Sequence, residues 1–203
     1  MYHLRPMPAR PSKPVLTSSL PPPACGHARR RFLGAAAALL AAPAIGRSGR
    51  ATAAVPGMRT LGFEHTHTGE EIVVSYASGD SYIDRALASL NWFLRDFRND
   101  AVHPIDPRLF DQLHTLATIT GTKTRFQVIS GYRSPATNHA LRARGGGVAE
   151  RSLHLQGRAI DIRLADVPLA DLRDAALSLR AGGVGYYPGS QFVHVDTGPV
   201  RRW

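Results

Sequence analysis

The sequence predicts an α+β fold in which helices pack on one side of a small, mainly antiparallel sheet. Short segments with strand character are separated by longer segments whose apolar residues recur at spacings of three and four. The last two predicted strands are joined by the turn residues 188–190, which makes them an antiparallel hairpin. One such domain follows an N-terminal segment of different composition.

The first half of this domain predicts two strands and two helices. Residues 59–76 form two short strands around a turn at 68–70. Residues 81–98 form a helix, because one helical face carries Ile83, Ala86, Leu87, Leu90, Phe93, Leu94 and Phe97. A second helix spans residues 106–121, since an aspartate cap and a proline begin it and a glycine ends it.

The second half predicts more strands than helices. Alternating apolar residues predict strands at 126–129 and 158–164. A serine–proline pair begins a predicted helix at 134–144, and a glycine pair ends another at 168–181. The hairpin strands span 184–187 and 191–196. The three glycines at 145–147 predict a mobile loop between two of these elements.

The charge of the chain is concentrated in its N-terminal segment. A formal charge of +10 on 203 residues suggests at first a nucleic-acid or membrane partner. However, eight basic residues and no acidic residue precede Val55, which leaves 17 basic against 15 acidic residues in the rest of the chain. The folded part is therefore close to neutral, and we expect no nucleic-acid partner.

Residues 1–54 have the layout of an export signal. Three arginines at 29–31 are followed by Phe32 and Leu33, and then by a short apolar run and small residues. This pattern resembles the twin-arginine signal and predicts a periplasmic protein, with cleavage near residue 54 and a mature domain at 55–203. The apolar run of about twelve residues is too short to span a bilayer, so we expect no stable membrane span. An uncleaved anchor is the alternative.

The only cysteine, Cys25, lies before the arginines and would be removed with the signal. The mature protein then has no disulfide and no thiol nucleophile. Cysteine-dependent catalysis is therefore excluded.

A set of metal-binding residues is the strongest functional signal. His154 and Asp161 are seven positions apart, and Asp161 lies on the polar face of a strand whose other face is isoleucine. If the strand at 191–196 is its neighbour, His194 points into the same cleft. Two histidines and one carboxylate are the ligands of a catalytic zinc site that leaves one position for water.

These residues lie in two longer motifs, S-x-H-x-x-G-x-A-x-D and F-V-H-x-D, and the chain also contains GFEHTHTGE, LNWFLRDFR and SGYRSPATN. With them, residues 60–203 resemble the zinc D-Ala-D-Ala peptidases and hedgehog-like metallopeptidases, and among these the YcbK-type murein endopeptidases. The resemblance implies Zn²⁺ held by His154, Asp161 and His194. It also implies a periplasmic enzyme that cuts peptide cross-links of peptidoglycan, with stem peptides as its partners.

One catalytic role follows from the resemblance, and a second follows from the strand face that Asp196 shares with His194. Arg133 matches an arginine that relatives use near the scissile carbonyl, where it would stabilise the oxyanion, and a salt bridge is the alternative. The vancomycin-resistance D,D-dipeptidases have a glutamate as general base three residues before the last ligand, where this chain has Gln191. Asp196 is the first candidate for the base, and an orienting role beside His194 is an equal alternative. Ser152 is expected to support the ligands.

Several other residues are candidates for the walls of the cleft. His65 and His67 share one strand face and could line the cleft or bind metal, although solvated or hydrogen-bonded histidines are more common there. Aromatic candidates for a groove floor, or alternatively for the core, are Tyr132, Tyr186, Tyr187 and Trp203. Arg201 and Arg202 would meet substrate carboxylates or form a solvated tail.

The sequence thus predicts a monomeric zinc-dependent murein endopeptidase. A zinc D,D- or L,D-carboxypeptidase is one alternative, because relatives perform both reactions. A non-catalytic, zinc-containing wall-binding module is another, because Gln191 stands where relatives have the glutamate.

Overall fold

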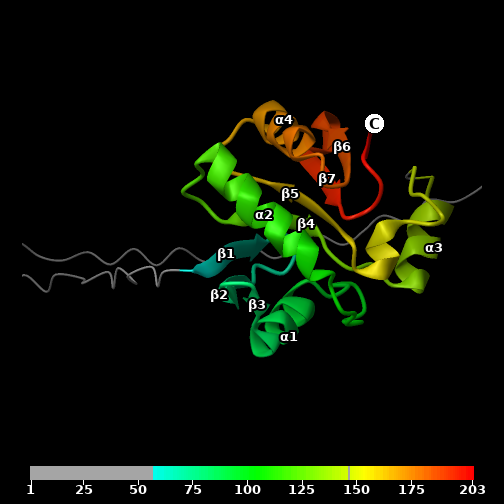
Figure 1. The fold of residues 1–203 in the computed structure, drawn as a ribbon. Helices are drawn as coiled ribbons and strands as arrows, with labels where there is room; N and C mark the ends of the chain where they lie inside the picture. Colours follow the sequence, from blue (N-terminus) through cyan, green and yellow to red (C-terminus); the bar gives the residue numbers. More distant parts are fainter. Residues whose placement is uncertain (1–56, 146) are drawn as a thin grey trace, which may run out of the picture. The chain divides into compact units, whose positions relative to one another are not determined.

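An eight-stranded mixed sheet organises the computed structural model, which describes residues 57–145 and 147–203 (Figure 1). The strands are β1 (Met58–His65), β2 (Glu71–Ser78), β3 (Ser81–Tyr82), β4 (Phe126–Ser130), β5 (Ala159–Arg163), β6 (Gly183–Tyr187), β7 (Phe192–Asp196) and β8 (Arg201–Arg202). Their spatial order is β3-β2-β1-β4-β5-β7-β6-β8. The β1–β4 and β6–β8 pairs are parallel and the other five are antiparallel, as expected for a mainly antiparallel sheet.

Four α-helices accompany the sheet, namely α1 (Asp84–Phe93), α2 (Pro107–Thr120), α3 (Pro135–Ala143) and α4 (Leu169–Leu179). Two short 3₁₀ helices, η1 (Leu153–Gln156) and η2 (Pro188–Ser190), lie in the connections. In Figure 1, α2 lies across the middle of the sheet, with α4 near β6 and β7 and α1 near β2 and β3. These three helices supply buried residues to one hydrophobic core, whereas α3 lies beside the segment that carries η1. The predicted α+β fold is confirmed.

Local signals explain why the helices begin where they do. The Asp106 carboxylate accepts a hydrogen bond from the backbone N–H of Arg108 at the start of α2, and Gly121 ends that helix with φ of 64°. The Ser134 hydroxyl caps α3 in the same way through the backbone N–H of Thr137. Both predicted helices are therefore found within about one residue of their expected bounds.

The predicted helix at 81–98 is wrong at both ends. Ser81 and Tyr82 pair with β2 as the short strand β3, which the sequence did not predict. After Phe93 the chain leaves the helix, and the buried carboxylate of Asp96 accepts hydrogen bonds from the backbone N–H groups of Arg98 and Ser134. These contacts compete with the helical pattern, so the apolar spacing alone overstated the length of the helix.

Helix α4 also stops earlier than predicted, at Leu179, because Arg180 adopts a left-handed conformation with φ of 49°. The short strand β8 was not predicted from the sequence. The predicted signal at 1–54 lies outside the described residues, as does Gly146 of the predicted mobile loop.

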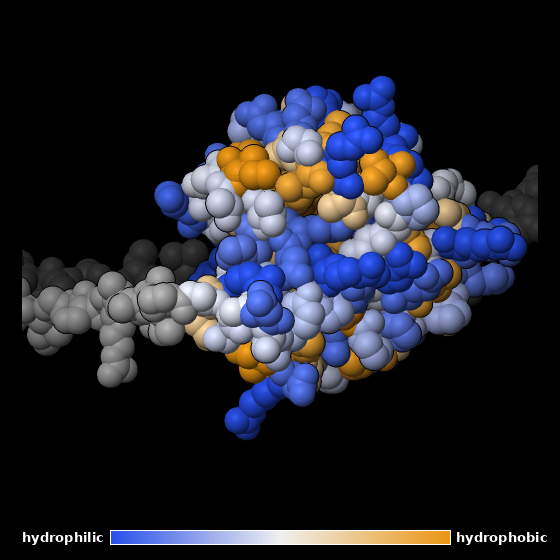
Figure 2. Space-filling model, viewed as in Figure 1, coloured by the Kyte–Doolittle hydropathy of each residue, from blue (hydrophilic) through white to orange (hydrophobic). Residues whose placement is uncertain are grey.

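The surface of the described residues has no dominant apolar area on the face shown in Figure 2, where polar residues separate the apolar ones. The large exposed apolar side chains are Val73, Tyr82, Trp92, Val102, Ile119, Tyr187, Val200 and Trp203. Among the helices at 57–145 and 147–203, none is both long enough and apolar enough to cross a membrane.

His65, a candidate cleft residue, lies instead in an aromatic cluster at the end of β1. Its ring is 1% exposed and contacts the rings of Phe93 and Phe97 at centroid distances of 6.1 and 5.2 Å. Burial, with the charge of His67 as a smaller cause, lowers the pKa of His65 to about 4. His65 is therefore a neutral core residue at pH 7.

This burial predicts a specific pH dependence of stability. Between pH 6.5 and 4 the unfolded chain binds a proton at His65 that the folded chain excludes, so stability is lost as the pH falls through this window. In urea titrations, the free energy of unfolding of the wild type should fall between pH 7 and pH 4 by about 2–3 kcal/mol more than that of His65→Phe. His139→Phe, at an exposed histidine on α3, should fall as much as the wild type. Equal slopes for His65→Phe and the wild type would contradict the assignment.

Candidate metal centre

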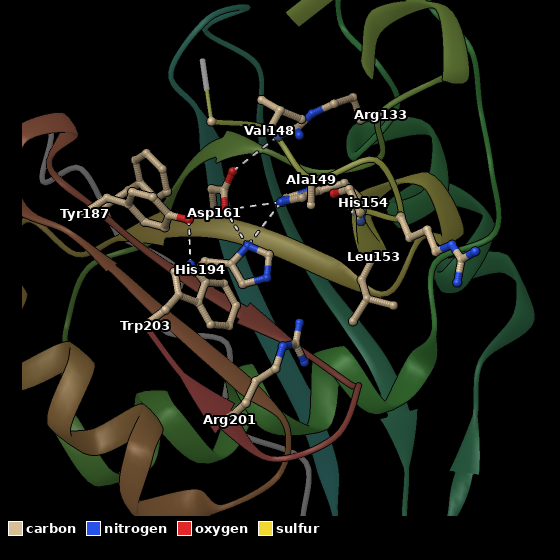
Figure 3. Close-up of a pocket in the computed structure, with 14 residues that line it drawn as sticks. Arg133, Val148, Ala149, Leu153, His154, Asp161, Tyr187, His194, Arg201 and Trp203 are labelled. Atoms are coloured by element: carbon tan, nitrogen blue, oxygen red, sulfur yellow. Dashed lines mark hydrogen bonds and ion pairs between the residues drawn. The ribbon is translucent and has the colours of Figure 1, made fainter. Parts of the chain in front are cut away.

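His154, Asp161 and His194 lie together on one face of the sheet, over β5 and β7 and beside the cavity shown in Figure 3. β5 and β7 are antiparallel neighbours, which is the condition that the sequence-based prediction of a shared cleft required. Asp161 lies directly opposite His194, and His154 comes from η1. Asp161 Oδ1 lies 2.9 Å from His194 Nδ1, and His154 Nε2 lies 3.2 Å from each of these two atoms. All three side chains are buried.

The ring of His154 is oriented by a backbone carbonyl. Its Nδ1 lies 2.7 Å from the carbonyl oxygen of Gly131, which can only accept, so Nδ1 carries the proton. The lone pair of Nε2 is then directed at Asp161 and His194. A Cβ at Gly131 would lie 2.6 Å from the carbonyl oxygen of Leu94, so only glycine allows the chain to pass here.

The ring of His194 is oriented by Asp196, whose Oδ2 lies 3.1 Å from Nε2. Asp196 is 0% exposed and accepts further hydrogen bonds from the backbone N–H groups of Gly183 and Gly198 and from the Arg201 guanidinium. Burial by itself raises the pKa of Asp196, but the hydrogen bonds from His194 and these partners hold it well below its usual range. His194 therefore donates from Nε2, which leaves Nδ1 as the nitrogen that faces the cluster and is available to a metal.

Asp196 consequently lies on the side of His194 that faces away from Asp161. This position corrects the first sequence-based candidate for the general base, because a carboxylate that is fully buried and bonded to five donors is not available to a water in the cavity. The geometry fits the alternative role, in which Asp196 orients His194.

The cluster brings two ring nitrogens and one carboxylate oxygen together, and this set of atoms is suited to binding a cation. Atoms that bind a tetrahedral zinc at about 2.0–2.1 Å lie about 3.4 Å from one another, close to the 2.9–3.2 Å found among His154, Asp161 and His194. Burial raises the pKa of Asp161, but protons on the two histidine nitrogens that face it outweigh burial and hold this pKa well below its usual range. A divalent metal would take the place of these protons between the same three atoms. The donor set therefore fits a divalent metal, with ionised Asp161 supplying the negative charge.

The cavity beside the cluster has a volume of about 380 Å³. Its walls are formed by Arg133, Gly147, Val148, Ala149, Arg151, Ser152, Leu153, His154, Asp161, Tyr187, Phe192, His194, Arg201 and Trp203. Asp161 is the only carboxylate among these residues of the described chain. One side of the cluster is thus closed by protein and the other opens into a space that can admit a substrate.

Arg133 lies on the wall of this cavity, in the turn after β4. Its Nη2 is 3.7 Å from Asp161 Oδ2, and its buried Nε has no hydrogen-bond partner among the described residues. Burial lowers the pKa of Arg133 and the Asp161 carboxylate opposes that shift, while a guanidinium keeps its proton at any ordinary pH. Arg133 therefore presents a fixed positive charge beside the cluster, in a long ion pair that leaves donors for a ligand.

The turn that carries Arg133 is anchored from the opposite side. The backbone N–H of Tyr132 donates to the carbonyl of Leu94 at 2.8 Å, and that of Ser134 donates to Asp96 at 2.9 Å. The Arg133 N–H itself donates to the carbonyl of His154. This anchoring ties the position of the guanidinium to that of the first histidine.

The remaining candidate residues divide into two groups. Ser152 lines the cavity, and its hydroxyl accepts a hydrogen bond from the backbone N–H of His154. Four candidates do not line it, namely His65, His67, Tyr132 and Gln191. His67 stacks on Phe97, Tyr132 stacks on His103, and the Gln191 amide donates to the carbonyl of Pro188. His65, His67 and Tyr132 therefore fit the packed or hydrogen-bonded alternatives given for them.

Arg201 is the main functional residue that sequence reasoning misplaced. Its guanidinium bonds both oxygens of Asp196 at 2.7 and 3.2 Å, a contact that neither sequence-based alternative included. Tyr187 and Trp203 do line the cavity, as one of the two sequence-based alternatives proposed. No sequence spacing signals the pairing of Arg201 with Asp196, since it depends on the turn between β7 and β8.

The orienting role of Asp196 can be tested by Asp196→Asn. The amide can donate to Nε2 of His194, which favours the tautomer with a proton on Nδ1, where a metal would bind. Zinc affinity measured against a chromophoric chelator should fall by about 10–100-fold. Asp111→Asn is the matched control, because Asp111 accepts from Tyr76 and Tyr82 away from the cavity. Unchanged affinity in Asp196→Asn would argue against this role.

Comparison with known proteins identifies the family. A model of one M15 peptidase family, described as Peptidoglycan L,D-endopeptidase MepK, matches residues 53–203. The Peptidoglycan L,D-endopeptidase MepK of Escherichia coli (strain K12) is 47% identical over 175 residues, covering 86% of this chain and 96% of that protein. The Probable peptidoglycan L,D-endopeptidase MepK of Haemophilus influenzae is 40% identical over 176 residues, covering 86% and 95%. The chain therefore belongs to this family of M15 peptidases.

Proposed function

We propose that this chain is a zinc-dependent endopeptidase that hydrolyses peptide cross-links in peptidoglycan. The observation that carries the proposal is the convergence of three buried acceptor atoms on one wall of an open cavity that also holds Arg133. Membership of a metal-dependent peptidase family supports the metal. The names of the relatives support the substrate and the L,D type of bond.

The residues around the cavity have different roles in the proposed hydrolysis. His154, Asp161 and His194 would hold the metal from the protein side, leaving the cavity side for water and substrate. A bound zinc lowers the pKa of its water toward about 7 and polarises an amide carbonyl. Asp196 keeps the His194 ring turned so that Nδ1 faces the metal position.

Arg133 would stabilise the negative charge that develops on the carbonyl oxygen. Its guanidinium is buried beside Asp161 and is fixed by the anchored turn, so little reorganisation is needed when the charge forms. Because the guanidinium is largely shielded from solvent, this interaction is stronger than it would be in water. Arg133 would thus add a fixed positive charge near the carbonyl oxygen, beside the residues that would hold the metal.

A periplasmic location is part of the same proposal. Peptidoglycan lies outside the inner membrane, so an enzyme that cuts it must be exported. The arginine pair at 29–30, followed by Phe32 and Leu33, supports the twin-arginine route, which carries proteins that are already folded. A metal could then be bound before export.

The function is tested with purified residues 55–203 and defined, cross-linked muropeptide dimers. Mass spectrometry should show cleavage at the L,D cross-link, its loss with a chelator and its recovery with added zinc. His154→Ala should bind less than one tenth of the zinc and lose at least 10³-fold in kcat/KM, because one of three ligands is missing. His139→Ala, at an exposed histidine of α3, should keep full activity. Undiminished cleavage by His154→Ala would refute the proposal, and release of single terminal amino acids would indicate a carboxypeptidase.

The role of Arg133 predicts a second kinetic signature. Arg133→Ala should lower kcat by about 10²–10³-fold while zinc content stays unchanged, since the charge acts on the transition state. Arg133→Lys should recover only part of the loss, because the compact ammonium cannot reproduce the planar guanidinium. A normal kcat in Arg133→Ala would leave the residue with only the structural ion pair to Asp161.

A further inference from the structure

Trp203 forms the wall of the cavity that lies against the second histidine. Its indole is 5.2 Å from the ring of His194, between ring centroids, and is inclined to it by 52° (Figure 3). The side chain is 49% exposed and lines the cavity. A large aromatic surface is thus held open to solvent beside the predicted metal position.

A glycine on the neighbouring strand leaves the space that this indole occupies. Gly185 on β6 lies directly opposite His194 on β7, so a side chain at 185 would stand beside the histidine on the same face of the sheet. A Cβ built at Gly185 would lie 2.7 Å from Cε2 of Trp203 and within 2.9 Å of two further ring atoms. The indole therefore occupies the space that a cross-strand neighbour of His194 would fill.

Four interactions fix the indole in this position. The Trp203 backbone pairs with β6 through the carbonyl of Val184 and the N–H of Tyr186. Its Nε1–H donates to the hydroxyl of Tyr187 at 2.7 Å, and the Arg201 guanidinium lies 4.9 Å from the ring centroid. Because Arg201 also bonds Asp196, which bonds His194, the indole and the histidine are held by one closed set of contacts.

The arrangement suits contact with a ligand better than it suits packing. A core tryptophan buries its ring, whereas this one is held rigidly and keeps about half of its surface exposed next to the cavity. Rigid aromatic side chains with one open face provide apolar contact area at little cost in conformational entropy. The exposed Arg151, which also lines the cavity, is suited to a charged group of a peptide and leaves its aliphatic parts for the indole.

We propose that Trp203 is a specificity-determining residue, whose open face packs against the aliphatic side chain of the cross-linking residue beside the scissile bond. This inference rests on the proposed peptidoglycan endopeptidase function. It assigns to Trp203 a role in substrate binding that is separate from holding the metal.

Steady-state kinetics on cross-linked muropeptide dimers test the inference. Trp203→Ala should raise KM at least tenfold, change kcat less than threefold and leave the zinc content unchanged, and Trp203→Phe should recover most of the KM. Trp92→Ala is the matched control, since Trp92 is equally exposed but lies on α1. An unchanged KM in Trp203→Ala would overturn the inference. A loss of zinc together with a fall in kcat alone would also overturn the inference, because it would mean that the ring only supports His194.

A double-mutant cycle with Gly185 sharpens the test. Gly185→Ala should displace the indole and raise KM several-fold, because the new methyl group meets the ring. In the Trp203→Ala background the same substitution should have no further effect, since the space is then empty. Additive effects of the two substitutions would show that Gly185 acts independently of Trp203 and would count against the inference.

Fluorescence separates a failure of this inference from a failure of the proposed function. The chain has two tryptophans, so Trp92→Phe leaves Trp203 as the only indole reporter. Stopped-flow mixing of this zinc-loaded variant with the dimers should give a rapid, saturable emission change, with half-saturation near KM. Absence of hydrolysis by the wild type would refute the proposed function. Even then, a saturable change would support contact of Trp203 with the muropeptide, and no change would overturn it.

Discussion

Asp161 and His194 face each other across one pair of antiparallel strands, and the rest of the centre is arranged around that register. Because side chains alternate along a strand, a slip of one residue would turn Asp161 into the core and bring an isoleucine to the cavity. The core prevents the slip, since Ile160 and Ile162 are fully buried on the opposite face. The hydrophobic packing of the sheet is therefore what sets the spacing of the polar cluster.

Groups behind the cluster determine its chemistry. The carbonyl of Gly131 and the carboxylate of Asp196 each accept a hydrogen bond from the outer nitrogen of one histidine, and this leaves the inner nitrogen of each ring facing the cluster. The Gly131 carbonyl and the Asp196 carboxylate thus determine which nitrogen of each imidazole is available to a metal. Arg201 extends this layer by neutralising Asp196, so that a buried negative charge behind His194 is paired rather than isolated.

The sequence predicted features whose signals are local and missed those that depend on distant contacts. The helix α2 has its cap, proline and final glycine within its own residues, and the alternation around Asp161 fixed the face on which the ligands meet. The end of α1 could not be predicted, because Asp96 draws the chain out of the helix through a contact with residue 134. The position of Asp196 was ambiguous for a similar reason. Being two residues from His194 on the same face fits both a base and an orienting group, and only the ring nitrogen that it contacts separates them.

The glycine pair at 182–183 follows α4 and resembles an ordinary helix stop. A Cβ at Gly182 would collide with the backbone carbonyl of Asp196, and a Cβ at Gly183 would lie 2.6 Å from its carboxylate. The chain can enter β6 beside Asp196 at the end of β7 only because both side chains are missing. Replacing these glycines to lengthen α4, a common way to make a protein more heat-resistant, would therefore displace the carboxylate that orients His194. In this fold the length of α4 and the orientation of the proposed metal ligand His194 cannot be engineered independently.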